Sequence, residues 1–202
     1  MSSKGLLIVV SGPAGSGKCT VLSHILREPQ FVYSVSATTR APRPGEQNGV
    51  NYHFLTREEF ERRIADGAML EHTEYCGNYY GTPKKEAEEV LESGRNLVLE
   101  IEVEGAANVK ARYPDAVTIM LLPPSYAEQE KRLRGRGTET EDRILARLER
   151  TRAELTMTDA YDYIVYNLDG GIEDCADDIR AIVRAEKCAR ARRGDVAADY
   201  FA

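Results

Sequence analysis

The stretch Gly12-Pro13-Ala14-Gly15-Ser16-Gly17-Lys18-Cys19 has the glycine spacing and the lysine of a phosphate-binding loop. In such a loop the glycines let successive backbone N–H groups point at phosphate oxygens, and the lysine reaches the β- and γ-phosphates. An apolar run precedes the stretch at residues 6–10, and a segment with helical spacing follows it at residues 18–26. We therefore expect the loop to join a buried strand to a helix N-terminus, where phosphate is favoured. This context argues against an ordinary glycine-rich turn and predicts a nucleoside triphosphate site.

The last position of the loop departs from the usual pattern. Ser or Thr normally stands there and its hydroxyl binds Mg²⁺, whereas this chain has Cys19 followed by Thr20. A thiol is a poor ligand for the hard Mg²⁺ ion, so we expect the metal to be held by nucleotide phosphates and water, with Thr20 as the candidate side-chain ligand. Cys19 either only fills space or, beside Lys18 at a helix N-terminus, has a pKa that favours the thiolate.

Composition limits the class of protein. The chain has 202 residues, enough for one domain with a buried core, and a formal net charge of −6, which argues against general nucleic-acid binding. No apolar stretch is long enough for a membrane span, and no secretory signal precedes the first apolar run. The four cysteines and three histidines show no spacing typical of a metal site or of disulfides. We expect a cytoplasmic protein, with no obligate protein partner evident.

The order of the apolar runs predicts an α/β fold. Strand-like runs occupy residues 6–10, 97–101, 117–122 and 163–166, with a possible fifth at 33–36. Helical patterns lie between them at 18–26, 83–93, 105–112, 125–134, 141–156 and 172–192. Alternating strands and helices imply a parallel sheet covered by helices. We assign this core to residues 1–36, 83–123 and 155–202, with a frayed or weakly docked tail from residue 194.

Two segments interrupt that alternation. Residues 37–82 contain turn formers, short alternating runs and one helical pattern at 57–65, which predicts a small, largely antiparallel insertion. Residues 124–154 are rich in arginine, and the stretch from Lys131 to Arg152 contains eight basic and four acidic residues. The sequence Gly135-Arg136-Gly137 divides this segment into two helical patterns. The arginines either form a solvated, ion-paired helix face or belong to a hinged lid that brings positive charge to an anion.

Three stretches together resemble the guanylate kinase family. They are residues 38–54, which read TTRAPRPGEQNGVNYHF, residues 77–82, GNYYGT, and residues 132–138, RLRGRGT. The resemblance covers nearly the whole chain, with the stretches in the family's order and at compatible spacing. It implies a P-loop kinase in which ATP donates a phosphoryl group to GMP, giving ADP and GDP, with Mg²⁺ as cofactor.

The resemblance also implies the residues that bind GMP. The positions matching those that bind its phosphate are Arg40, Arg43, Tyr52 and Tyr80, and the positions matching those that bind guanine are Ser36, Glu71, Thr82 and Glu102. The chemistry agrees, because a phosphate dianion suits a fork of donors and a carboxylate accepts the two neighbouring N–H donors of guanine. The family usually has aspartate where this chain has Glu102, which keeps the charge and moves the carboxylate by about one methylene.

On the donor side the resemblance implies that ATP lies against the loop and the lid. The loop residues are Gly12, Pro13, Ala14, Gly15, Ser16, Gly17, Lys18, Cys19 and Thr20. The residues expected to stabilise the transferring group are Lys18, Arg40, Arg132, Arg136 and Arg147, and Asn167 matches a position near adenine. Leu168 replaces the acidic neighbour usual there. A non-catalytic module that binds phosphopeptides, and a kinase for another nucleoside monophosphate, remain the alternatives.

Overall fold

The computed structural model describes residues 4–135, 137 and 140–201, and its larger sheet has five strands in the order β2-β7-β1-β8-β9. They are β1 Leu7–Ser11, β2 Phe31–Tyr33, β7 Asn96–Glu100, β8 Val117–Leu122 and β9 Tyr163–Tyr166. Every neighbouring pair in this sheet is parallel. All residues of β1 and β8 are buried, which explains why these strands are continuous apolar runs. The predicted α/β class with a parallel core sheet is confirmed.

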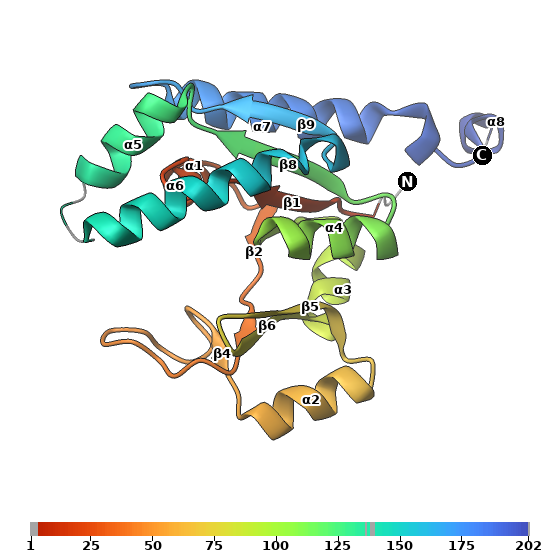
Figure 1. Cartoon of the computed structure of the whole chain (residues 1–202). Coiled ribbons are helices and arrows are strands. Elements are labelled where there is room, and N and C mark those ends of the chain that lie inside the picture. The colour runs from red at the N-terminus through yellow and green to blue at the C-terminus, as the bar shows by residue number, and fades with distance from the viewer. Residues whose placement is uncertain (1–3, 136, 138–139, 202) are drawn as a thin grey trace.

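Helices cover both faces of this sheet (Figure 1). On one face α1 Lys18–Ile25 and α7 Ile172–Cys188 bury Val21, Leu22 and Ile179 against alternate strand residues. On the other face α3 Lys84–Glu92 and α4 Val103–Arg112 pack on the side chains that point the opposite way. Successive strand residues thus serve two separate cores, as the two-residue period of a strand requires.

The segment between β2 and α3 forms a second, smaller sheet in the order β4-β3-β6-β5. Its strands are β3 Ala37–Thr38, β4 His53–Phe54, β5 Met69–Tyr75 and β6 Asn78–Pro83. The β3–β4 pair is parallel and the other two pairs are antiparallel. Helix α2 Arg57–Ala65 packs on this sheet through Phe60, whose ring stacks on Tyr79 with centroids 5.3 Å apart. Figure 1 shows this insertion as a separate lobe beside the core.

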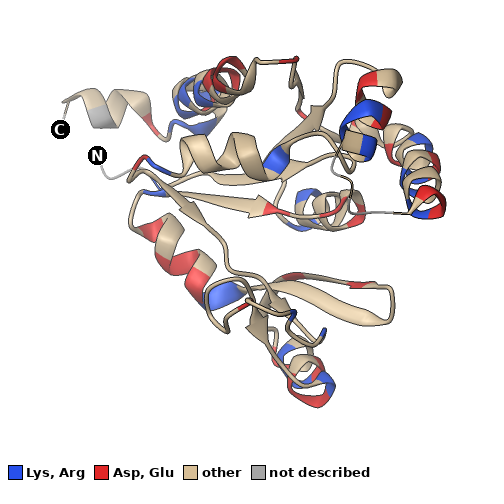
Figure 2. Cartoon of the chain, turned by 90° about the vertical axis from the view of Figure 1, so that its left-hand side faces the viewer, with Lys and Arg blue, Asp and Glu red and all other residues tan. Residues whose placement is uncertain are grey.

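Two helices follow β8 and lie over the phosphate-binding loop. They are α5 Tyr126–Gly135 and α6 Glu141–Leu155, and they carry both signs of charge (Figure 2). Leu133, Ile144 and Leu148 form a small buried cluster against Ala14 of the loop. The side chain of Gln129 adds hydrogen bonds from its Nε2 to the Ala14 carbonyl at 2.8 Å and to the Thr151 hydroxyl at 2.7 Å. The loop and the two helices are therefore packed together.

Several details differ from the sequence-based expectations. The fifth strand lies at Phe31–Tyr33, earlier than residues 33–36, and the last long helix ends at Cys188 because Ala189 is extended; the 3₁₀ turn Arg190–Arg192 follows. The tail is not merely frayed, since Val196–Phe201 forms helix α8, on which Phe201 is 85% exposed. A further 3₁₀ turn, Thr158–Ala160, connects α6 to β9. None of the helices in the described part of the chain is both long and apolar enough to cross a membrane.

Candidate functional site

A cavity of about 330 Å³ lies at the carboxyl ends of β1 and β7, between the core and the insertion. Open α/β sheets commonly place their ligands at this edge. Seven of the predicted site residues line it: Lys18, Cys19, Ser36, Tyr52, Glu71, Tyr80 and Glu102. The other lining residues, for which the sequence predicted no specific ligand contact, are Tyr33, Thr73, Tyr75, Gly81, Glu100 and Ile101. We call this space the acceptor cavity.

The phosphate-binding loop has a shape that only glycine permits at two of its positions. Gly12 has φ +149°, and a Cβ there would lie 2.1 Å from the Leu121 carbonyl oxygen. Gly17 has φ +88°, and a Cβ there would lie 2.3 Å from Nδ2 of Asn167. Gly17 directly precedes α1, so the loop leads into a helix N-terminus with its free N–H groups.

Lys18 folds back over the loop in this structure. Its Nζ donates to the carbonyl of Gly12 at 2.5 Å and to that of Pro13 at 3.3 Å. The hydroxyl of Ser16 is buried and has no hydrogen-bond partner among the described residues. The ammonium group therefore lies at the border between the loop and the acceptor cavity. The unpaired hydroxyl of Ser16 is two residues away in the same loop.

Glu71 is the buried carboxylate of the acceptor cavity, with 4% of its surface exposed. Thr82 Oγ1 donates to its Oε1 at 2.8 Å, across the β5–β6 pair. Burial raises the pKa of Glu71 to about 7, against the lowering effect of the hydrogen bonds from Thr82. A single hydroxyl partner leaves this carboxylate with capacity to accept further hydrogen bonds from a ligand.

Arg40 lies beside Tyr52 and Tyr80, which line the acceptor cavity and which we call the tyrosine wall. Its Nη2 donates to both carboxylate oxygens of Glu46, at 2.9 and 3.0 Å. Its guanidinium lies 5.5 Å from the ring centre of Tyr52, and that ring lies 6.1 Å from the ring of Tyr80. The structure thus brings Arg40, Tyr52 and Tyr80 together. Arg43 is exposed and does not line the cavity, although its backbone N–H donates to Glu46 at 2.7 Å.

Glu100, the last residue of β7, holds Cys19 by a hydrogen bond. Cys19 Sγ donates to Glu100 Oε1 at 3.3 Å, and the hydroxyl of Tyr33 donates to Oε2 at 3.5 Å. Desolvation of the thiol and the Glu100 carboxylate raise the pKa of Cys19 and outweigh the lowering effect of Lys18. The expectation of a thiolate-favouring environment was therefore wrong, because an acidic neighbour across the sheet was invisible in the local sequence.

Glu102 directly precedes α4, as its N-cap residue, and is held by a residue of α6. Arg150 Nη2 donates to Glu102 Oε2 at 2.7 Å, and Arg150 Nε donates to Glu154 Oε1 at 2.8 Å. The guanidinium also lies 4.5 Å from the ring centre of Tyr75. Sequence reasoning counted Arg150 among the arginines of this segment without giving it a role. Its contact with Glu102 joins residues far apart in sequence, so only the structure reveals it.

A second cavity, of about 400 Å³, lies on the other side of the loop, and we call it the donor cavity. Its lining includes Gly15, Gly17, Thr20, Arg132, Gly135, Asn167 and Leu168. Asn167 Nδ2 donates to the Ser16 carbonyl at 2.8 Å, while its buried Oδ1 has no partner among the described residues. Arg132 donates from Nη2 to the Asn167 carbonyl at 3.0 Å and from Nε to Glu128 at 3.1 Å.

The structure places neither of two further predicted arginines in these cavities. Arg147 lies on the exposed side of α6 and lines neither cavity. Arg136 falls outside the described residues. Thr20 lines the donor cavity, whereas Cys19 lines the acceptor cavity. No group of three or more His, Cys, Asp or Glu side chains in the described ranges could hold a metal ion, so the protein offers no complete set of metal ligands there.

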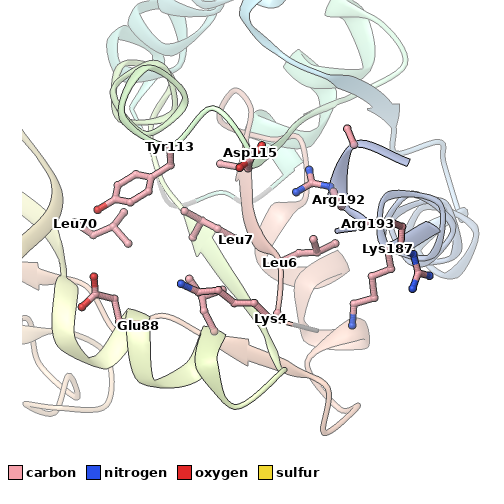
Figure 3. A pocket seen from close by; sticks show the side chains of 14 residues that line it. Lys4, Leu6, Leu7, Leu70, Glu88, Tyr113, Asp115, Lys187, Arg192 and Arg193 are labelled. Carbon is pink, nitrogen blue, oxygen red and sulfur yellow. The ribbon is translucent and has the colours of Figure 1, made fainter. Parts of the chain in front are cut away.

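A larger cavity, of about 480 Å³, lies at the opposite end of the sheet (Figure 3). Leu6 and Leu7, at the start of β1, line it together with Leu70, Tyr113 and side chains from the end of α7. In Figure 3 its charged side chains, among them Lys4 and Lys187, lie on different sides of the opening and do not converge on one point. Its position at the amino ends of the strands and this divergence set it apart from the site built by the loop.

Comparisons with known proteins give the relatives of this chain in sequence and in fold. The sequence profile of the family described as Guanylate kinase matches residues 4–186. The chain is 52% identical over 190 residues to a guanylate kinase of Halalkalibacterium halodurans, which covers 94% of this chain and 92% of the relative. It is 50% identical over 194 residues to a guanylate kinase of Bacillus subtilis, covering 95% and 94%. Among solved structures, the guanylate kinase of Anaplasma phagocytophilum superposes with a TM-score of 0.77 at 36% identity, covering 96% of this chain and 92% of that one.

Proposed function

Because this chain belongs to the guanylate kinase family, we propose that it transfers the γ-phosphoryl group of ATP to GMP, giving ADP and GDP. The observation that carries the proposal is the acceptor cavity, where Lys18 of the phosphate-binding loop and the buried Glu71 line one space. In our proposal the site for the phosphates of ATP therefore lies next to the site for GMP. A non-catalytic module that binds phosphopeptides would not need the phosphate-binding loop and its lysine.

Guanine is the base that suits Glu71. Its N1–H and N2–H₂ groups are neighbouring donors, which an ionised carboxylate accepts side by side, whereas adenine presents a lone pair at N1. In our proposal Glu71 accepts these donors and the hydroxyl of Ser36 lies toward O6, whereas the hydroxyl of Thr82, predicted to do the same, donates to Glu71. The burial of Glu71 supports this role, since a carboxylate with 4% exposure is costly unless a ligand or a partner satisfies it.

The phosphate of GMP is proposed to bind at the tyrosine wall. Tyr52 and Tyr80 supply hydroxyl donors, and Arg40 supplies a planar fork that fits a phosphate. Arg40 is already oriented by its two hydrogen bonds to Glu46. The dianionic phosphate competes with that carboxylate for the guanidinium. Arg43 completes the set if the exposed loop that carries it moves toward the cavity on binding.

ATP is proposed to bind with its phosphates on the loop and its base in the donor cavity. Free backbone N–H groups of the loop and of the start of α1 face the phosphates, and Lys18 exchanges its two carbonyl partners for phosphate oxygens. The unpartnered Oδ1 of Asn167 is an acceptor suited to the amino group of adenine. Arg132 lines the same cavity, and Arg136 and Arg147 remain predicted contacts of the transferring group.

The transfer itself needs placement and charge neutralisation more than proton transfer. The phosphate oxygen of GMP is already a competent nucleophile, so no general base is required. Lys18 and the arginines offset the charge that develops on the transferring group. Bound Mg²⁺ supplies further neutralisation at the β- and γ-phosphates. Because the described residues provide no complete set of metal ligands, we propose that nucleotide and water hold this ion, with the hydroxyl of Thr20 as a candidate ligand from the loop.

A coupled assay of ADP release tests the proposal. We expect ADP production with GMP, and far less with AMP, UMP or CMP, at saturating ATP. Lys18→Ala should nearly abolish turnover while GMP still binds in calorimetry, and Lys85→Ala, an exposed lysine of α3, serves as the matched control. GMP binding without any GMP-dependent ADP production by the wild type would instead support the binding-module alternative.

A further inference from the structure

Arg150 contacts three parts of the molecule at once. It lies on α6, pairs with Glu102 of the core at 2.7 Å, and places its guanidinium 4.5 Å from the ring centre of Tyr75 in the insertion. Both Glu102 and Tyr75 line the acceptor cavity. The arginine therefore links the helix above the loop to the wall of the acceptor cavity.

Each of the three carboxylates in that wall is held by a different donor. Glu71 accepts from Thr82 of the insertion, and Glu100 accepts from the thiol of Cys19. Glu102 alone among these three accepts from α6, through Arg150. A change in the position of α6 is thus transmitted to one carboxylate of the cavity and not directly to the other two.

The position of Arg150 is itself constrained. Its Nε donates to Glu154, one turn further along α6, whose side chain is only 11% exposed. This contact leaves the Nη2 edge of the guanidinium directed at Glu102 and its flat face toward Tyr75. Lysine could pair with one carboxylate but could not keep two of them and an aromatic face together, because its ammonium is a single point of charge.

We propose that Arg150 is a positioning residue for guanine recognition, which holds the Glu102 carboxylate where it accepts a hydrogen from the exocyclic amino group of GMP. The inference rests on the proposed function. Guanine presents three hydrogens on N1 and N2, and one carboxylate accepts two of them in a side-by-side pair, so the third needs a separate acceptor. Glu102 supplies it, and its placement depends on α6. The hydrogen bond from the amino group of GMP to Glu102 then requires α6 to be in the position seen here.

The test compares GMP with inosine monophosphate, which lacks the amino group. We expect Arg150→Met to lower kcat/KM for GMP about tenfold, mostly through KM, and to change kcat/KM for inosine monophosphate by less than about twofold, since a lost charge-assisted hydrogen bond is of that size. Arg150→Lys should fall between. Arg152→Met is the matched control: it removes the same charge from the same helix, where Arg152 is 69% exposed and pairs only weakly with Glu149, at 3.6 Å.

A double-mutant cycle with Glu102→Gln separates positioning from a structural role. The quantity compared is the ratio of kcat/KM for GMP to kcat/KM for inosine monophosphate. If Arg150 acts through Glu102, this ratio should be no lower in the variant with both Arg150→Met and Glu102→Gln than in Glu102→Gln alone. Arg150→Met should lower the thermal midpoint more than Arg152→Met does, because it also leaves the largely buried Glu154 carboxylate unpaired. The positioning role is therefore read from the discrimination between the two substrates and not from stability. Equal losses for the two substrates, additive effects in the cycle, or unchanged discrimination would each overturn the proposal. A wild type that is inactive with GMP would overturn the proposed function, and this inference with it.

Discussion

The hydroxyl of Thr82 donates to the carboxylate of Glu71 at 2.8 Å; both side chains are almost fully buried, and Glu71 lines the acceptor cavity. This hydrogen bond favours the ionised carboxylate, while burial favours the protonated one, and burial has the larger effect on the pKa. The group proposed to recognise guanine therefore titrates near neutral pH. Two buried residues on paired strands thus control how the cavity responds to pH.

Thr82→Val should weaken GMP binding at neutral pH. The substitution keeps the shape and removes the donor, so the pKa of Glu71 rises further above about 7 and less of the carboxylate is ionised. We expect KM for GMP to increase about tenfold at pH 7, from the lost hydrogen bond and the lost ionisation together. Steady-state titrations at pH 7 and pH 9 give the check: part of the loss should recover at pH 9. A pH-independent loss would show that Thr82 contacts the base without acting on Glu71.

The affinity for GMP should fall as the pH falls through 7. Only the ionised form of Glu71 accepts both guanine donors, and burial raises its pKa to about 7, so binding releases a proton below that pH. KM for GMP should rise by about tenfold per pH unit well below 7. The phosphate of GMP itself titrates near pH 6, so Glu71→Gln is the reference: it should bind GMP weakly and retain only the phosphate's dependence. Identical pH profiles for the two proteins would contradict the role of Glu71.

The loop and the parallel core followed from local pattern, because buried strands and a loop that only glycine can form leave direct traces in sequence. The arrangement of the acceptor cavity did not. Tyr33 and Tyr75 enter it from strand ends that are distant in sequence, and sequence reasoning assigned neither of them a role. Their signal is only their position at the ends of β2 and β5, which cannot be known before the strand order is.

Cys19 shows the same limit in electrostatics. Its local sequence, beside a lysine at a helix N-terminus, favours a lowered pKa. The structure adds Glu100 from a neighbouring strand, which raises it. For the tail, which was expected to be frayed or weakly docked, the exposure of Tyr200 and Phe201 agrees with weak docking, whereas the helix Val196–Phe201 was not predicted.

Glu71→Gln should stabilise the folded protein at alkaline pH. The folded-state pKa of Glu71 is raised from 4.5 to about 7, so folding becomes less favourable as the pH rises between those two values. The full effect is about 3 kcal/mol above pH 8, since one pKa unit corresponds to about 1.4 kcal/mol. Urea unfolding should give similar stabilities for the two proteins at pH 5 and a more stable variant at pH 8. Glu149→Gln, at a carboxylate that is 75% exposed, should leave the pH dependence unchanged. A variant no more stable than the wild type at pH 8 would mean that the cavity solvates Glu71 well.

Cys19→Thr should lower the concentration of Mg²⁺ needed for activity. Cys19 occupies the loop position where a hydroxyl commonly binds the metal, and its thiol is instead paired with Glu100 at 3.3 Å. A threonine there offers a hard oxygen in place of a soft sulfur, so the ion no longer depends on nucleotide and water alone. We expect half-maximal activity at a Mg²⁺ concentration a few-fold lower, with a smaller change for the softer Mn²⁺ ion. The control is Cys188→Thr, at an exposed cysteine that ends α7. If Cys19→Thr and the control gave the same Mg²⁺ titration as the wild type, residue 19 would lie outside the reach of the metal, and Thr20 would be left as the loop's candidate hydroxyl.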